Sequence, residues 1–190
     1  MSIFTIVLLA IIVVAGIWAI MSYNNLVNLK HAVSKAWSNI DVLLKQRHDE
    51  LPKLVETCKQ YKQFEESTLT KVTEARGKVQ EARVKQDIPA LGQAESALRA
   101  GLGSIIATFE AYPELKAIET FQHLMSRISG LENAIADRRE FYNESVNINN
   151  VAIEQFPVLI LARIFSFGSF DLLRFSDNEK KDVDVKALFS

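Results

Sequence analysis

The stretch IFTIVLLAIIVVAGIWAIM, residues Ile3 to Met21, decides how the rest of the chain is read. It holds no charged side chain, and as a helix it would extend roughly 30 Å, the thickness of a bilayer's hydrocarbon core. Trp18 and Tyr23 fall where an interfacial aromatic belt is expected. The sequence therefore predicts a transmembrane anchor over residues 1–23. Its expected lipid-facing side chains are Ile3, Phe4, Ile6, Val7, Leu8, Leu9, Ile11, Ile12, Val13, Val14, Ile17, Trp18 and Ile20.

A cleaved signal peptide is the alternative reading of this stretch. Such a peptide carries a basic leading region, a shorter apolar run and a cleavage site flanked by small residues, and this pattern is not met here. Basic residues follow the apolar run, beginning with Lys30 and Lys35, and none precedes it. By the positive-inside rule, we expect a single-pass protein of the inner (cytoplasmic) membrane with most of the chain in the cytoplasm.

The composition favours a helical protein and excludes several kinds of binding site. Lys and Arg number 22 against 23 Asp and Glu, so the chain lacks the basic excess typical of nucleic-acid binding, and no nucleic-acid partner is expected. The low numbers of glycine and proline, 7 and 4, favour helices. The single cysteine, Cys58, excludes an internal disulfide and a cysteine-cluster metal site, and we expect it in the core. No cofactor is expected.

Beyond the anchor, apolar residues recur at helical spacing and no strand-like alternation of useful length occurs. The pattern predicts an all-α fold, in which the N-terminal transmembrane helix is followed by an antiparallel bundle of three or four long helices over residues 24–155. Breaks or kinks are expected at Leu51-Pro52, Asp87-Ile88-Pro89 and Tyr112-Pro113, with a further break near Gly130. Leu69, Val72, Ala75, Val79 and Ala82 are expected to form the buried stripe of the charged second segment.

Several short motifs resemble the LemA family, and they stand in the family's order over about residues 5 to 175. They are Arg47, Asp49, Leu51-Pro52, Leu54-Val55, Ala75-Arg76, Glu110 to Phe121 (EAYPELKAIETF), Leu131-Glu132-Asn133, Arg138-Arg139, Tyr142-Asn143-Glu144, Asn150 and Phe156-Pro157. The resemblance implies a small membrane protein with one N-terminal span and a helical-bundle domain, and it implies no particular reaction. The chain departs from the family at Asn149, where tyrosine is more usual, and at Val158-Leu159, where Ser-Asn is usual.

Candidate chemical motifs are sparse. His31, His48 and His123 lack the four-residue spacing of a zinc-binding helix, and no phosphate loop or nucleophile elbow occurs. Glu110 and Glu114 flank Pro113 and could act as an acid and a base, although charge at a helix N-terminus is the more ordinary role.

Two features suggest contact surfaces instead. Asn143, Asn147, Asn150 and Glu154 share one helix face, either as an amide ladder to a neighbouring helix or subunit or as a solvated face. FPVLILARIFSFGSF, residues Phe156 to Phe170, allows three readings: a second span, core, or a surface against lipid headgroups or another subunit. Arg163 would cost at least about 2.5 kcal/mol in the bilayer centre, and its apolar flanks are too short to span. The expected contact residues of this segment are Phe156, Arg163, Phe165, Phe167 and Phe170.

These observations predict a non-enzymatic, membrane-anchored helical scaffold that self-assembles or recruits partners. Its expected partners are the lipid bilayer, further copies of itself and a membrane protein. A regulatory adaptor of a membrane protease or sensor kinase is the alternative, and a hydrolase using Glu110 and Glu114 is a third reading. We expect residues 156–175 to be a contact segment and residues 176–190 to be a flexible tail.

Overall fold

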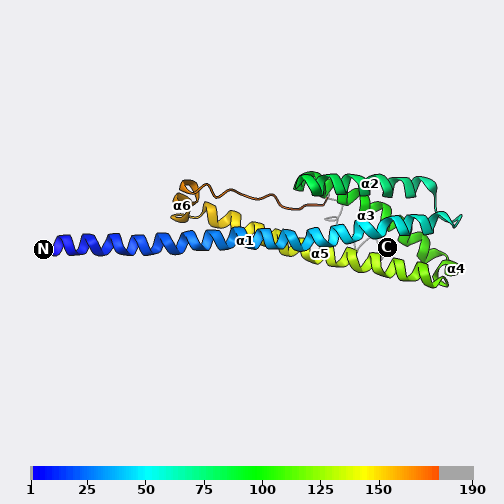
Figure 1. The fold of residues 1–190 in the computed structure, drawn as a ribbon, viewed down its shortest axis with the longest axis horizontal. Coiled ribbons are helices and arrows are strands. Elements are labelled where there is room, and N and C mark those ends of the chain that lie inside the picture. The colour runs from blue at the N-terminus through cyan, green and yellow to red at the C-terminus, as the bar shows by residue number, and fades with distance from the viewer. Residues whose placement is uncertain (1, 176–190) are drawn as a thin grey trace, which may run out of the picture. The chain divides into compact units, whose positions relative to one another are not determined.

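The computed structural model describes residues 2–175, and all regular structure within them is helical. The helices, in chain order, are α1 (Ile3–Lys59), α2 (Glu66–Lys85), α3 (Ile88–Ala111), α4 (Pro113–Lys116), α5 (Glu119–Glu154) and α6 (Val158–Ile164) (Figure 1). This confirms the predicted fold class: a long apolar N-terminal helix followed by a helical bundle with long helices. The predicted flexible tail, residues 176–190, lies outside the described residues.

Helix α1 runs through Pro52 without a break, so of the two alternatives expected at Leu51-Pro52 the break is wrong, and the kink stays a prediction. Proline has no N–H, and at this position the acceptor left without its helical donor is the carbonyl of His48. Arg76 of α2 supplies a replacement, because its Nε donates to the His48 carbonyl oxygen at 2.9 Å. Its Nη2 also lies 2.8 Å from Nε2 of the His48 ring. A tertiary hydrogen bond thus replaces the helical one and α1 continues to Lys59.

The first turn of the bundle lies at residues 60–65, which hold neither glycine nor proline, and sequence reasoning missed it. Phe64 of this turn is buried, and its ring centroid lies 5.6 Å from that of Phe121. Helix α2 then presents the five apolar residues of its expected stripe to the core, and all five are buried. Asp87 caps α3 by accepting a hydrogen bond from the Ala90 amide at 3.0 Å.

The last long helix, α5, is unbroken. The chain leaves α4 at Lys116, and α5 then runs from Glu119 to Glu154, so the expected break near Gly130 is wrong. A side chain at Gly130 would meet nothing within 4 Å, so this glycine is neither a break nor a close contact. By contrast, a Cβ on Gly101 would lie 2.6 Å from Val72, so this glycine allows α2 and α3 to pack closely.

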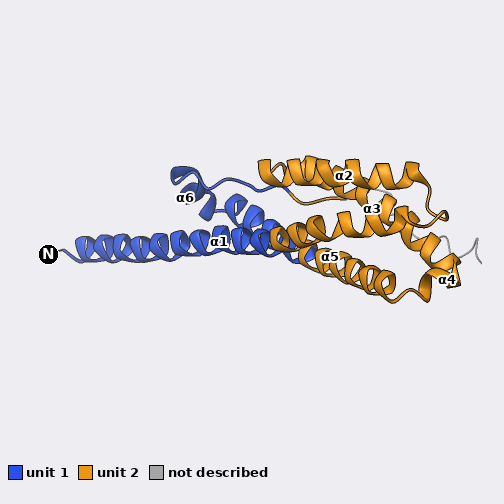
Figure 2. Ribbon diagram, turned by 45° about the vertical axis from the view of Figure 1, so that its right-hand side comes forward, with its two compact units in different colours: residues 1–39, 140–171 blue, residues 40–139, 172–190 orange. Residues whose placement is uncertain are grey.

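The chain divides into two compact units, coloured separately in Figure 2. Unit 1 comprises residues 1–39 and 140–171, and therefore holds the first part of α1, the end of α5, and α6. Unit 2 comprises residues 40–139 and 172–190, with α2, α3 and α4. Within unit 2, α2 and α3 lie side by side, and Cys58 is buried as predicted.

Candidate functional site

The predicted anchor residues are all exposed in unit 1. The 13 named side chains range from 38% exposed at Trp18 to 82% at Ile3. Among the described residues, α1 is the one helix long and apolar enough to cross a membrane, and none of its most apolar window is buried by the rest of the protein. An apolar surface of this extent requires cover from outside the fold.

The Phe-rich segment, residues Phe156 to Phe170, lies against α1 immediately beyond this apolar stretch. The ring of Tyr23 packs edge-on against Phe165 and Phe167, with centroid distances of 4.8 and 5.8 Å. Behind these rings, Ala162 of α6 is buried in a small cluster with Leu26 of α1 and Ile153 of α5. Val158, Leu161, Ala152 and Phe167 pack around that cluster.

The same segment has an outer face that the described structure leaves half exposed or more. Phe156 is 81% exposed and Ile164 66%, while Ile160 and Phe165 are each about half exposed. Phe156, Ile160 and Ile164 are four residues apart, and Arg163 is exposed beside them. The segment is thus core on one side and surface on the other, with the predicted contact residues divided between the two sides.

The asparagines of α5 hold the chain that follows α6. Asn150 Nδ2 donates to the Phe170 carbonyl at 2.9 Å, and its Oδ1 accepts from the Phe170 amide at 3.0 Å. Buried Asn149 donates to the Gly168 carbonyl at 3.4 Å, and Tyr142 Oη donates to the Asp171 carbonyl at 3.0 Å. The amides of Asn149 and Asn150 therefore bind an extended segment of the same chain.

The other predicted ladder residues are placed differently. Asn147 is exposed and Asn143 is half-buried, so Asn147 remains a predicted contact residue for a neighbouring molecule.

Asn147 borders an exposed apolar stripe on α5, which no sequence argument singled out. We call this the α5 stripe: it consists of Phe141, Ile148 and Val151, each nearly half exposed and spaced seven and three residues apart on one side of the helix.

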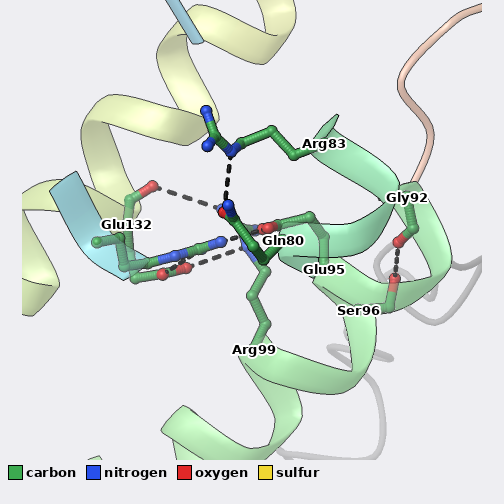
Figure 3. Close-up of polar contacts among 8 residues, drawn as sticks. Gln80, Arg83, Gly92, Glu95, Ser96, Arg99 and Glu132 are labelled. Atoms are coloured by element: carbon green, nitrogen blue, oxygen red, sulfur yellow. Dashed lines mark hydrogen bonds and ion pairs between the residues drawn. The ribbon is translucent and has the colours of Figure 1, made fainter. Parts of the chain in front are cut away.

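Unit 2 contains a group of buried and half-buried charges, which we call the ion cluster: Arg47, Glu95, Arg99 and Glu132. Arg47 is 1% exposed and Glu95 0%, and they form a direct ion pair. Arg47 Nη1 also donates to Glu132 Oε1 at 2.6 Å, while Arg99 Nε lies 3.2 Å from the second oxygen of Glu132. Figure 3 shows Glu95 and Arg99, both from α3, directed towards Glu132 of α5.

Burial sets the electrostatics of the ion cluster. It raises the pKa of Glu95 above its ordinary value, against the opposing attraction of Arg47. Burial also acts to lower the pKa of Arg47, but the attraction of Glu95 and Glu132 outweighs it and leaves that pKa raised. Glu95 Oε2 and Arg47 Nε are buried without a hydrogen-bond partner within residues 2–175. The cluster is therefore a set of charges held by one another in the core.

A sequence signal for this cluster existed, although the expected site residues did not include it. Arg47 lies seven residues from both Ile40 and Leu54, which are fully buried, so it occupies a core position of α1. Glu95 likewise lies between buried Leu91 and Leu98 on the inner face of α3. A charge on an apolar stripe predicts a buried partner of opposite sign.

The remaining chemical candidates do not come together. Glu110 and Glu114 are exposed, and Glu114 accepts a hydrogen bond from Gln63 at 3.4 Å. His48 is half-buried under Arg76, and burial followed by this positive charge lowers its pKa. In the described part of the chain, no three side chains of the kinds that bind metals form a cluster.

These features define a class: all-α proteins that join a long exposed apolar helix to a helical bundle with a buried ion cluster. The family whose model matches residues 36–187 is the LemA family, and the chain belongs to it. This confirms the resemblance seen in the motifs. Family membership and the apolar helix together indicate a membrane-associated protein.

Curated relatives carry two kinds of name. Magnetosome protein MamQ 2 of Paramagnetospirillum magneticum is 27% identical over 78% of this chain, and magnetosome protein MamQ of Magnetospirillum gryphiswaldense is 26% identical over the same share. Protein LemA of Metamycoplasma hominis is 28% identical over 87% of this chain and 74% of its own length. The chain spans 63% of the length of the MamQ proteins that it matches.

Proposed function

We propose that the protein is a non-enzymatic scaffold, anchored in the inner membrane by α1, whose helical body self-assembles beneath the membrane on the cytoplasmic side. The observation that carries this proposal is the α5 stripe. Its three apolar side chains are exposed in the unit that also holds the anchor. Fully burying an apolar side chain of this size gains about 1.5–3 kcal/mol, so a second copy covering the stripe would gain several kcal/mol.

Anchoring in the membrane favours self-association through the α5 stripe, although this surface alone would bind a second copy weakly. Copies held in one membrane share a thin layer, and confinement raises their effective concentration for one another. The exposed amide of Asn147 beside the stripe would supply a polar contact that sets the register between copies. The cytoplasmic placement rests on the basic residues after the apolar run, beginning with Lys30 and Lys35.

The test is the mass of the full-length protein in mild detergent, measured by light scattering. We expect a homo-oligomer, and we expect Phe141→Ser together with Ile148→Ser to reduce it to monomers with unchanged helicity. Val84→Ser is the matched control, because Val84 is 68% exposed on α2 in the other unit, and it should leave the oligomer intact.

Two results would contradict self-assembly. A wild-type protein that is monomeric would remove the basis of the proposal. A single copy that co-purifies in fixed ratio with a membrane protease or sensor kinase would favour the adaptor function instead.

A further inference from the structure

We infer that the outer face of α6 rests in the bilayer interface, at the boundary between acyl chains and headgroups, beside the point where α1 leaves the membrane. We call Phe156, Ile160, Arg163, Ile164 and Phe165 the α6 face; Phe156 lies just before the helix and Phe165 just after it. This inference rests on the proposed anchoring of α1 and adds a second membrane contact to it.

The first argument is position. Tyr23 lies two residues beyond Met21, the end of the apolar stretch, which corresponds to about 3 Å along the helix axis. Because the ring of Tyr23 packs against Phe165 and Phe167, the Phe-rich segment is fixed at this level of α1. A bilayer that covers the exposed stretch from Ile3 to Met21 therefore reaches the α6 face, which continues the same apolar surface.

The second argument is composition. The α6 face carries two phenylalanines and two isoleucines, all at least half exposed, together with one arginine. Apolar side chains with an adjacent basic residue are typical of helices that lie in the plane of a membrane interface. The long side chain of Arg163 can place its charge among lipid phosphates while its methylene groups stay with the apolar side chains. Helix α6 has 7 residues and spans only about 10 Å, so it fits the interface and not the full hydrocarbon core.

The third argument is that the α6 face is held in place. Its inner side is buried against Leu26 and Ile153, and the chain after it is tied to Asn149 and Asn150. The exposed residues therefore do not fold back to cover one another. The lipid bilayer is the occupant that these contacts favour, because the apolar anchor beside them is itself exposed.

The test uses spin labels on single cysteines in the full-length protein, reconstituted in vesicles of phosphatidylcholine and phosphatidylglycerol. Labels would replace Phe156 and Ile164 on the α6 face, Ile12 in the anchor and Lys35 on the exposed side of α1. Lys35 lies 12 residues, or about 18 Å, beyond Tyr23 and is the aqueous control. Native Cys58 is fully buried, and the unmutated protein provides the control for its labelling.

We expect the labels at Phe156 and Ile164 to collide more often with oxygen than with a water-soluble nickel chelate. The ratio of the two collision rates should be several-fold higher than at Lys35 and lower than at Ile12. Circular dichroism would confirm that each labelled protein keeps its helicity.

The outcomes separate this inference from the anchoring on which it rests. A lipid-exposed label at Ile12 with water-exposed labels at Phe156 and Ile164 would overturn the interfacial contact alone. Labels at Phe156 and Ile164 that are shielded from both oxygen and nickel would show cover by protein and would also overturn it. A water-exposed label at Ile12 would overturn the anchor and the interfacial contact together.

Discussion

Because α1 continues through Pro52 without a break, we can predict how much Arg76 contributes to stability. Its Nε donates to the His48 carbonyl at 2.9 Å, which is the acceptor that the missing N–H of Pro52 leaves open. A hydrogen bond from a charged donor contributes about 1.5–3 kcal/mol. Arg76→Met is therefore expected to lower the free energy of unfolding by about 2 kcal/mol. For a chain of this size, that corresponds to a loss of about 4–8 °C in Tm.

A double-mutant cycle with Pro52→Ala tests the cause of that loss. An alanine at position 52 restores an N–H, which can donate to the His48 carbonyl within the helix. Arg76→Met should then cost at least about 1 kcal/mol less than it does beside proline, because the carbonyl retains a donor. The assay is thermal denaturation of the four proteins in one mild detergent, followed by circular dichroism.

Arg83 on the same helix provides the matched control. Its Nη1 pairs with Asp41 at 2.8 Å and has no contact with the carbonyl of His48. Arg83→Met should cost the same with proline or alanine at position 52. If Arg76→Met also costs the same in both backgrounds, the arginine does not compensate for the proline and the reasoning is wrong.

Three further predictions concern unit 2. Arg47→Met should lower the free energy of unfolding by about 3 kcal/mol at pH 7, because it leaves Glu95 buried without its cation; the deficit should shrink in melts at lower pH, where Glu95 takes up a proton. Gly92→Ala should cost about 1–3 kcal/mol, since its Cβ would lie 2.0 Å from the Arg174 carbonyl oxygen, whereas Gly103→Ala, with nothing within 4 Å, should stabilise α3 by about 0.5–1 kcal/mol in the same melts. Burial raises the pKa of the Cys58 thiol to about 12 from 9.0. Its contribution to stability is therefore full below pH 9 and lost as pH rises towards 12, a loss that Cys58→Ala should lack in pH-dependent unfolding.

The sequence predicted those parts of the fold that depend on neighbouring residues. The buried stripe of α2 and the break at Asp87-Ile88-Pro89 follow from spacing and side-chain type over a few residues, and both are confirmed. The continuity of α1 through Pro52 could not be predicted in this way, because the compensating donor, Arg76, lies 28 residues from His48 in the sequence. The turn at residues 60–65 is similar, since buried Phe64 packs on Phe121 rather than on a local turn motif.

The ion cluster shows why local patterns also missed the interior charges. Arg47 pairs with residues 48 and 85 positions away, so its partners are defined only when α1, α3 and α5 come together. Its place on the apolar stripe was nevertheless visible in the sequence. A charge at such a position is a constraint on the fold, because removing either partner leaves the other buried and unpaired.

The Phe-rich segment could not be assigned to core or surface from its composition, because one side of it is buried and the other is exposed. Apolar residues line both sides of α6 at the same helical spacing. Even so, Ala162 is buried, whereas Ile164, two residues later, is 66% exposed. The difference arises from which side meets Leu26 and Ile153, and this depends on how the chain after α5 is held. Asn150 holds that chain through two hydrogen bonds to the Phe170 backbone. Asn150, expected to contact a neighbouring helix or subunit or to be solvated, thus binds a later segment of its own chain, and this bond holds the segment that follows the α6 face.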